Sequence, residues 1–273
     1  MTALAGKVVV VTGAAGGMGA TQVAALTEAG ARVVALDIAP RPDASVGAMV
    51  RDGAAVHYRQ LDVTDPVAWT ELSRSVSAAY GRVDGLVNNA GITRRARLLE
   101  VTRADLDNVW SVNVTGAVLA MQATAPLMTS GASIVNVGSL AALTAHYPVA
   151  YTASKWALRG LSRVACLELG PRGIRVNTIH PGFIETAMTA SAPDAFRTAS
   201  IAETPLGRTG TSHEVAQLVV FLLGDGASFI TGADIPVDGG ASAHGGVKSI
   251  SDALATGPQP VVTESVVTGP AHP

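Results

Sequence analysis

The most constraining feature of this chain is a short apolar run that leads directly into a glycine-rich turn. Four consecutive valines, Val8 to Val11, are followed by Thr-Gly-Ala-Ala-Gly-Gly-Met-Gly, ending at Gly19, and then by a helix-like segment. A strand that delivers such a turn to a helix N-terminus lets a pyrophosphate approach the backbone, where free N–H groups and the helix dipole favour an anion. An ordinary strand–helix turn is the alternative. The position after the first strand favours a dinucleotide site.

Short runs rich in β-branched residues alternate with longer Ala- and Leu-rich segments along the rest of the chain. This alternation predicts a parallel sheet whose strands are joined by crossover helices. We therefore expect one α/β, doubly wound (Rossmann) domain over residues 1–240, with a seven-stranded parallel sheet and helices on both faces. The predicted strands are Val8–Val11, Arg32–Asp37, Val56–Asp62, Gly85–Asn88, Ser133–Val137, Arg175–His180 and Ile235–Val237. The predicted helices begin near Gly17, Asp65, Thr102, Tyr151 and His213.

Residues 241–273 differ in character from the rest of the chain. They are rich in Gly, Pro, Ala, Thr and Ser and show no clear period. Such a composition is typical of a mobile C-terminal tail. The other interpretation is an arm that covers the mouth of the active site or a neighbouring subunit.

Charge balance and cysteine usage limit the possible partners. The chain has 19 basic and 21 acidic residues, which gives no reason to expect nucleic acid. A hydrophobic fraction of 48% with 15% charged residues is high for a monomer, so we expect apolar surface to be buried in a homo-oligomer. No secretory signal or membrane-spanning run is recognisable. Cys166 is the single cysteine, which excludes an intramolecular disulfide and a cysteine-cluster metal site. We expect a cytoplasmic protein without a bound metal.

Tyr151 and Lys155 are four residues apart in a chain that has only four tyrosines and three lysines. On a helix, residues i and i+4 lie on one face, so the ammonium can approach the phenol. A nearby cation favours the phenolate and lowers the tyrosine pKa. A positioned phenol of this kind can exchange a proton with an alcohol oxygen. Two unrelated surface residues on one helix are the alternative interpretation.

Acidic residues at two strand ends bear on the cofactor. Asp37 closes the second predicted strand, where a carboxylate accepts hydrogen bonds from the ribose hydroxyls of an adenosine and repels a 2′-phosphate. NAD(H) is therefore favoured over NADP(H), although Arg41 is nearby. Asp62 and Val63 end the third strand and are expected near the adenine. Asp62 is alternatively a helix cap, but Asp65 before a proline is the better one.

Three motifs in the same order carry a resemblance to a known family. The glycine turn, Asn88-Asn89-Ala90-Gly91 and Tyr151-x-x-x-Lys155 together resemble the short-chain dehydrogenase/reductase family over about Leu4 to Gly240. The resemblance implies an NAD(P)-dependent oxidoreductase that interconverts a secondary alcohol and a ketone, commonly as a homotetramer. The catalytic residues that it implies are Asn113, Ser139, Tyr151 and Lys155. The cofactor-binding residues that it implies are Gly13, Gly17, Met18, Gly19, Asp37, Asp62, Val63, Asn89, Gly91, Tyr151, Lys155, Pro181, Ile184 and Thr186.

The resemblance also bears on the substrate. Stretches such as Ser154-Lys-Trp-Ala-Leu-Arg-Gly look like those of bacterial hydroxysteroid dehydrogenases in this family, which implies an apolar cyclic or hydroxysteroid-like substrate. One departure concerns Ser139 and Tyr151, whose numbers differ by twelve where the family usually has about thirteen. The shorter loop, Leu140–Val149, belongs to the expected substrate pocket, and so the resemblance does not fix the substrate.

The pocket is expected to be bordered by Arg94–Leu99, Leu140–Val149 and Phe183–Phe196, with Leu143, Tyr147, Phe183 and Met188 favouring an apolar ring. Tyr147 is also the competing candidate for the catalytic tyrosine. The cluster of Arg94, Arg95 and Arg97 is either a solvated loop or a site for an acidic substrate or carrier protein. The second alternative would favour an acyl or polyketide β-ketoreductase. A cofactor-sensing binding protein without turnover is a further alternative. Such proteins typically lack the tyrosine or lysine, and both are present here.

Overall fold

The sheet forms because its strands carry apolar side chains on both faces. In the computed structural model, which describes residues 3–190 and 192–256, Val9 and Val11 of strand β1 (Val8–Thr12) belong to one core cluster. Val10, between them, belongs to the other cluster. Burial on both faces is typical of a parallel sheet between two helical layers.

The strands lie in the order β3–β2–β1–β4–β5–β6–β7, and every neighbouring pair is parallel. The order reverses between β1 and β4, so a crevice for a ligand is expected at the carboxyl ends of these strands. This confirms the predicted doubly wound, seven-stranded sheet, with strand ends that differ from the prediction by two residues at most. The remaining strands are β2 (Arg32–Asp37), β3 (Val56–Gln60), β4 (Gly85–Asn88), β5 (Ser133–Val137), β6 (Arg175–Pro181) and β7 (Asp234–Val237).

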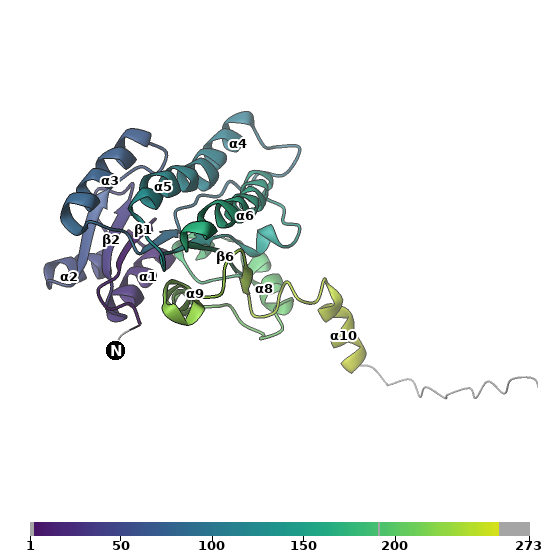
Figure 1. Cartoon of the computed structure of the whole chain (residues 1–273). Coiled ribbons are helices and arrows are strands. Elements are labelled where there is room, and N and C mark those ends of the chain that lie inside the picture. Colours follow the sequence, from purple (N-terminus) through teal and green to yellow (C-terminus); the bar gives the residue numbers. More distant parts are fainter. Residues whose placement is uncertain (1–2, 191, 257–273) are drawn as a thin grey trace, which may run out of the picture.

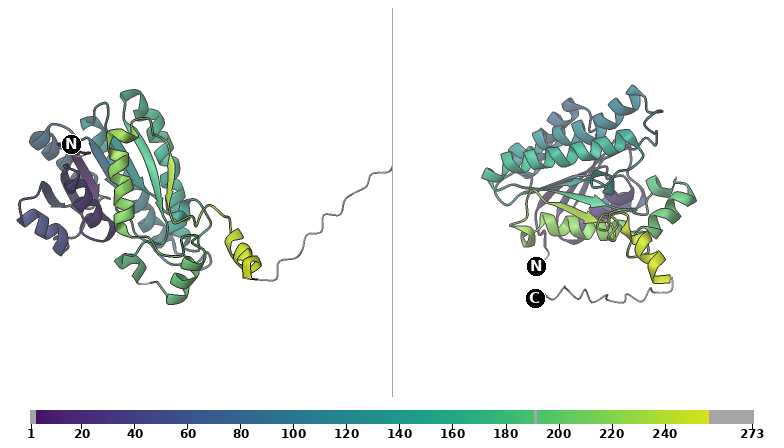
Figure 2. Two further views of the ribbon diagram at one scale, coloured as in Figure 1. Left: turned by 90° about the horizontal axis from the view of Figure 1, so that it is seen from below. Right: turned by 90° about the vertical axis from the view of Figure 1, so that its right-hand side faces the viewer.

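Two helical layers cover the sheet, as the two views of Figure 2 show. Helices α1 (Gly17–Glu28) and α9 (Ser212–Leu223) pack on one face. Helices α3 (Pro66–Tyr80), α5 (Gly116–Thr124) and α6 (Val149–Leu169) pack on the other (Figure 1). Helix α4 (Arg103–Trp110) runs into α5 through a π-helical turn, η1 (Ser111–Thr115).

Side-chain caps explain where three of the predicted helices begin. Asp65 accepts a hydrogen bond from Val67 N, and Pro66 occupies the first position of α3, which confirms Asp65 as the cap. Thr102 before α4 and Thr211 before α9 each form a capping box. Helix α6 begins at Val149, two residues before the predicted start.

Four helices were not predicted: α2 (Ala44–Arg51), α7 (Ala187–Ala190), α8 (Asp194–Ala202) and α10 (Val247–Thr256). Helix α10 falls in the segment for which the sequence showed no clear period, and it projects from the body of the domain (Figures 1 and 2). Residues 257–273 of the same segment lie outside the described residues. Among the helices that the structure describes, none is long and apolar enough to cross a membrane.

Candidate active site

The glycine turn is shaped by contacts that only glycine permits. A Cβ atom on Gly19 would lie 1.9 Å from the carbonyl oxygen of Gly13, and Gly13 itself has a φ of +65°. The first turn of α1 is therefore pressed onto the end of β1. Gly16 precedes α1 without a side-chain cap, so the N–H groups of this helix start face the crevice with the positive end of the dipole. Gly17 is exposed there, while Met18 packs against the core.

Asn89 fastens this turn to the neighbouring strand. Its Nδ2 donates to the carbonyl oxygens of Thr12 and Gly13, each at 3.0 Å, and Gln22 donates to its Oδ1 at 3.2 Å. The side-chain amide of Asn89 therefore uses its hydrogen bonds to hold the glycine turn. Asn89 supports the predicted cofactor site through the backbone that it holds.

Carboxylates line the other side of the turn. Asp37 accepts from Ala15 N at 2.9 Å and from Ala39 N at 3.0 Å, which fixes both of its oxygens beside the glycine turn. Asp43, the cap of α2, also faces the turn, because a Cβ on Gly16 would lie 3.9 Å from Asp43 Oδ2. Asp62 accepts from the backbone N–H and the hydroxyl of Thr64. A dinucleotide fits this site, because the uncapped start of α1 and the exposed Gly17 can receive its phosphates and the carboxylates can accept hydrogen bonds from it.

The loop after β6 reaches the glycine turn from the opposite side. Pro181 ends the strand, and Ile184 is buried and bridges to Gly210. A Cβ on Gly17 would lie 3.9 Å from Thr186 Cβ. The glycine turn and the loop after β6, whose residues the family resemblance assigns to the cofactor, therefore meet in space.

A π-helical turn places Asn113 behind the site. Its Oδ1 accepts from Ile92 N at 2.8 Å, and its Nδ2 donates to Ile92 O at 3.0 Å and to Ser154 Oγ at 2.9 Å. A π-turn inside a helix is frequent at functional sites. Gly91 and Val63 complete these surroundings. A Cβ on Gly91 would lie 3.4 Å from both Asn113 Oδ1 and Lys155 Nζ, and Val63 packs against the start of α5.

Lys155 and Tyr151 lie on one face of α6, as predicted. Lys155 is 4% exposed, and its Nζ donates to Val137 O at 2.8 Å and lies 5.7 Å from the centre of the Tyr151 ring. Burial lowers the pKa of Lys155 to about 8. Burial also raises the pKa of Tyr151, and a hydrogen bond with Ser139 acts in the opposite direction.

The expectation that Lys155 lowers the Tyr151 pKa is therefore not supported by this structure, because desolvation dominates. The shortened loop leaves the hydrogen bond between Ser139 and Tyr151 intact. Ser139 lies two residues after the end of β5 and caps the 3-10 turn η3 (Leu140–Ala142), accepting from Ala141 N at 3.1 Å.

A cavity of about 640 Å³ adjoins Ser139 and Tyr151. His146, Tyr147, Phe183 and Phe196 form one cluster of rings along its wall, with centroids 5.0–6.2 Å apart. Tyr147 contacts Phe196 and the guanidinium of Arg97, in the lining role expected for it. Leu143 does not line the cavity, and the Met188 side chain lies outside the described residues.

Several cavity residues were not expected from the sequence. Glu203 and Thr204 follow α8, and His244, Gly245 and Gly246 come from the segment after β7. His244 Nε2 lies 2.7 Å from Glu203 O, which ties the two segments together. An arm over the mouth of the active site was one of the two interpretations of this segment, but its glycine- and serine-rich sequence has no pattern that identifies the individual lining residues. Within the described residues, no cluster of His, Cys, Asp or Glu could hold a metal ion.

The doubly wound sheet and the meeting of serine, tyrosine and lysine beside a dinucleotide turn define an oxidoreductase that acts on CH–OH groups. Residues 13–242 match the family model described as enoyl-(acyl carrier protein) reductase. The chain belongs to the short-chain dehydrogenase/reductase family.

Named relatives and solved structures agree with this assignment. A 3-alpha-(or 20-beta)-hydroxysteroid dehydrogenase of Mycobacterium tuberculosis is 41% identical over 243 residues, covering 88% of this chain and 91% of the relative. A trans-4-hydroxycyclohexanecarboxylate dehydrogenase of Sinomonas cyclohexanicum is 37% identical over 254 residues, covering 88% and 94%. A short-chain dehydrogenase/reductase structure from Serratia marcescens has a TM-score of 0.83 at 35% identity, covering 88% of this chain and 100% of that chain.

Proposed function

We propose that this protein is an NAD(H)-dependent dehydrogenase that interconverts an apolar cyclic or hydroxysteroid-like secondary alcohol and its ketone. One observation carries the proposal: the hydrogen-bonded Tyr151 and Ser139 face a mostly apolar cavity of about 640 Å³. A cavity of this size accommodates a ring system.

Tyr151 exchanges the proton with the substrate oxygen in this proposal. Its hydroxyl protonates the ketone oxygen in reduction and takes the alcohol proton in oxidation. Ser139 donates a hydrogen bond to the same oxygen and stabilises the charge that develops there. The nicotinamide, when bound, supplies or accepts the hydride.

Lys155 and Asn113 serve the proton path behind Tyr151. Lys155 is buried with a pKa of about 8, so it changes charge at mildly alkaline pH. We assign it the contact with the cofactor ribose. The Asn113 side chain donates to Ser154 Oγ, and the Ser154 hydroxyl donates to the backbone carbonyl oxygen of Tyr151 at 2.7 Å. Asn113 thereby also fixes the first turns of α6. We also propose that Asn113 binds a water molecule that links Lys155 to solvent.

The preference for NAD(H) rests on negative charge around the glycine turn. Asp37 and Asp43 both face this turn. A 2′-phosphate on the adenosine ribose would meet both carboxylates, whereas free ribose hydroxyls can donate to Asp37.

The wall of rings supports an apolar cyclic substrate. His146, Tyr147, Phe183 and Phe196 offer faces and edges that suit a flat or puckered ring. The two relatives from Mycobacterium tuberculosis and Sinomonas cyclohexanicum are both named for alcohols on rings.

One observation keeps an acyl or polyketide β-ketoreductase as the second candidate. Arg95 lines the cavity, where its guanidinium would suit an acidic group. The neighbouring arginines also lie close to this region: Arg94 Nε is 3.7 Å from Asp105 Oδ1, and the Arg97 guanidinium stacks on Tyr147.

We further propose a cytoplasmic homotetramer. Exposed apolar side chains on α4 and α6, which are Trp110, Trp156, Val164 and Leu167, support subunit contacts at these helices. The single cysteine agrees with a reducing compartment.

A panel of alcohols and ketones tests the substrate class and the cofactor together. Reduced nicotinamide absorbance is followed with NAD(H) and NADP(H) on neutral cyclic ketones, carboxylated cyclic ketones and carrier-bound 3-oxoacyl chains. We expect the highest kcat/KM with a neutral cyclic ketone and NADH. Far better turnover of the carrier-bound 3-oxoacyl chains would overturn the substrate assignment in favour of the second candidate. Far better turnover of the carboxylated cyclic ketones would overturn the neutral, hydroxysteroid-like substrate.

A further inference from the structure

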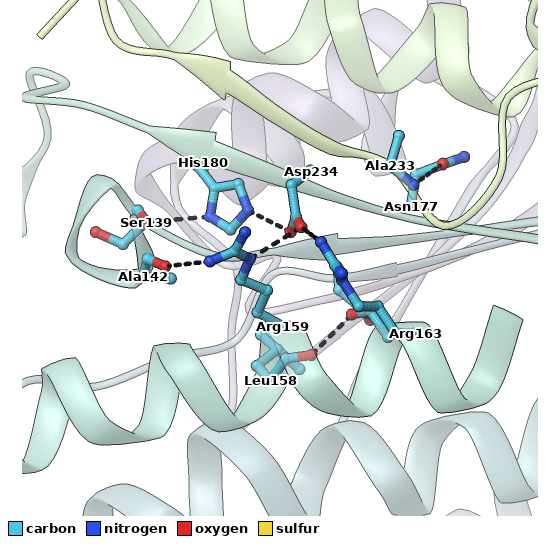
Figure 3. Close-up of polar contacts among 11 residues, drawn as sticks. Ser139, Ala142, Leu158, Arg159, Arg163, Asn177, His180, Ala233 and Asp234 are labelled. Carbon is cyan, nitrogen blue, oxygen red and sulfur yellow. Dashed lines mark hydrogen bonds and ion pairs between the residues drawn. The ribbon is translucent and has the colours of Figure 1, made fainter. Parts of the chain in front are cut away.

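A cluster of charged side chains meets where β5, β6, β7 and α6 come together, beside the catalytic serine (Figure 3). Its centre is Asp234, at the start of β7. The carboxylate lies 2.9 Å from His180 Nε2, and it accepts from Arg159 Nε at 2.9 Å and from Arg163 Nη2 at 2.6 Å. Partial burial alone would raise the pKa of Asp234, but hydrogen bonds from Arg163, His180 and Arg159 outweigh it and hold the pKa at about 2. Asp234 is therefore ionised.

His180 has hydrogen-bond acceptors on both sides. Its Nδ1 lies 3.1 Å from Ser139 O, and its Nε2 faces the Asp234 carboxylate. A backbone carbonyl and an ionised carboxylate can only accept, so a ring nitrogen bonds to either of them as the donor. The His180 side chain is fully buried between these two acceptors.

Two side chains of the cluster form hydrogen bonds to the two ends of the turn that carries Ser139. His180 donates to the Ser139 carbonyl, and Arg159 Nη1 donates to Ala142 O at 3.3 Å. The imidazole also lies directly against the preceding residue, because a Cβ on Gly138 would be 2.6 Å from His180 Nδ1. The turn between Ser139 and Ala142 is thus held at each end by a side chain anchored on Asp234.

We propose that His180, Arg159 and Asp234 form a clamp that positions the Ser139 turn and so aims the serine hydroxyl at Tyr151 and the substrate oxygen. These three are positioning residues, and their role rests on the proposed function. A buried charged pair rarely adds net stability over apolar side chains of similar volume. A role in fixing the catalytic turn accounts for the cluster better than a role in stability. The turn that the clamp holds is also the start of the loop Leu140–Val149, which is one residue shorter than is usual in the family.

Arg163 provides the matched control. It reaches the same Asp234 oxygen from the surface, with a side chain that is 61% exposed, and within the described residues it makes no hydrogen bond to the Ser139 turn. Loss of the Arg163 charge perturbs Asp234 but leaves in place the hydrogen bonds from His180 and Arg159 to the turn.

The kinetic test compares Asp234→Asn with Arg163→Gln on the best ketone of the panel. Asp234→Asn should lower kcat about 10-fold or more while KM and the affinity for NADH change less than about twofold, since the turn acts on the reacting oxygen. Arg163→Gln should keep kcat within about twofold. Equal kcat values for Asp234→Asn and the wild type would overturn the clamp.

Two substitutions of His180 test the clamp independently of whether Asp234→Asn folds. His180→Asn places an amide donor near the position of Nδ1, so it should retain more activity than His180→Leu, which has no donor. Unfolding temperatures confirm that each variant is folded. Activity of His180→Leu at the wild-type kcat, in folded protein, would contradict the proposal.

Nitrogen-15 NMR of the histidine side chains gives a readout that needs no turnover. Nδ1 of His180 should carry the proton that it donates to the Ser139 carbonyl in the wild type, and the His180 side-chain signals should change in Asp234→Asn. A wild-type Nδ1 without a proton would contradict the donor assignment. Absence of wild-type turnover on every ketone would instead overturn the proposed function and the catalytic role of the clamp with it. Wild-type turnover that Asp234→Asn and His180→Leu both match would overturn the clamp alone.

Discussion

Burial moves the pKa values of Tyr151 and Lys155 in opposite directions, because it disfavours the charged form of each residue. Tyr151 holds its proton more firmly than an exposed phenol, which suits donation to a ketone oxygen. Lys155 releases its proton more readily than an exposed lysine. The i, i+4 spacing correctly placed the two residues together, but it could not reveal how strongly the surrounding strands desolvate them.

The Lys155 pKa predicts a dependence of stability on pH in the cofactor-free protein. Between about pH 8 and the ordinary lysine value of 10.5, the folded state binds fewer protons at Lys155 than the unfolded state does. Stability therefore rises with pH in this window, by up to about 2 kcal/mol between pH 8 and 9.5. Denaturant unfolding of the wild type and of Lys155→Met measures the difference. Parallel pH profiles for the two proteins would show that the lysine is not desolvated as described.

Asp37→Asn tests the cofactor preference at one side chain. The substitution keeps the shape of the residue and removes the charge that a 2′-phosphate would meet. We expect kcat/KM with NADPH to rise about 10-fold, the equivalent of about 1.4 kcal/mol, while that with NADH falls. Arg32→Gln, at the exposed start of the same strand, is the charge-changing control. An unchanged ratio of the two cofactors in Asp37→Asn would refute the role assigned to this carboxylate.

At the scale of elements, the strands were predictable because buried parallel strands are rich in β-branched residues. All seven were found, and the helices with strong caps or long apolar stripes were found with them. The short α2 and the helix α10 were not predicted. Helix α10 shows Val247, Ile250 and Leu254 at helical spacing, but the glycines and serines around it hide this period.

Gly19 and Gly160 provide a contrast between two helices. Gly19→Ala should destabilise the protein by more than about 3 kcal/mol and abolish NADH binding, because its Cβ would lie 1.9 Å from the Gly13 carbonyl oxygen. Gly160→Ala, on the outer side of α6 with nothing within 4 Å of its Cβ in the single chain, should leave NADH binding unchanged. Thermal unfolding and NADH fluorescence measure both. Normal NADH binding by Gly19→Ala would contradict the close packing of the turn.

At the scale of the whole molecule, the parallel sheet brings distant parts of the chain to one edge. The glycine turn, the Ser139 turn, α6 and the loop after β6 are separated by long crossovers and meet at the carboxyl ends of the strands. The motif residues were predictable because each has a local spacing. The clamp was not, because His180 and Asp234 lie 54 residues apart and no local pattern links them. The composition of residues 241–273 allowed an arm over the mouth of the active site as one of two interpretations, but it did not single out His244 as a lining residue.

The central claim is that Tyr151 handles the proton in an NAD(H)-dependent interconversion of alcohol and ketone. It is tested most directly by measuring turnover of the best cyclic ketone and NADH affinity for the wild type and for Tyr151→Phe. Loss of the hydroxyl should lower kcat by about 10² to 10⁴ and leave the NADH dissociation constant within about twofold. Turnover by Tyr151→Phe at the wild-type rate would contradict the account.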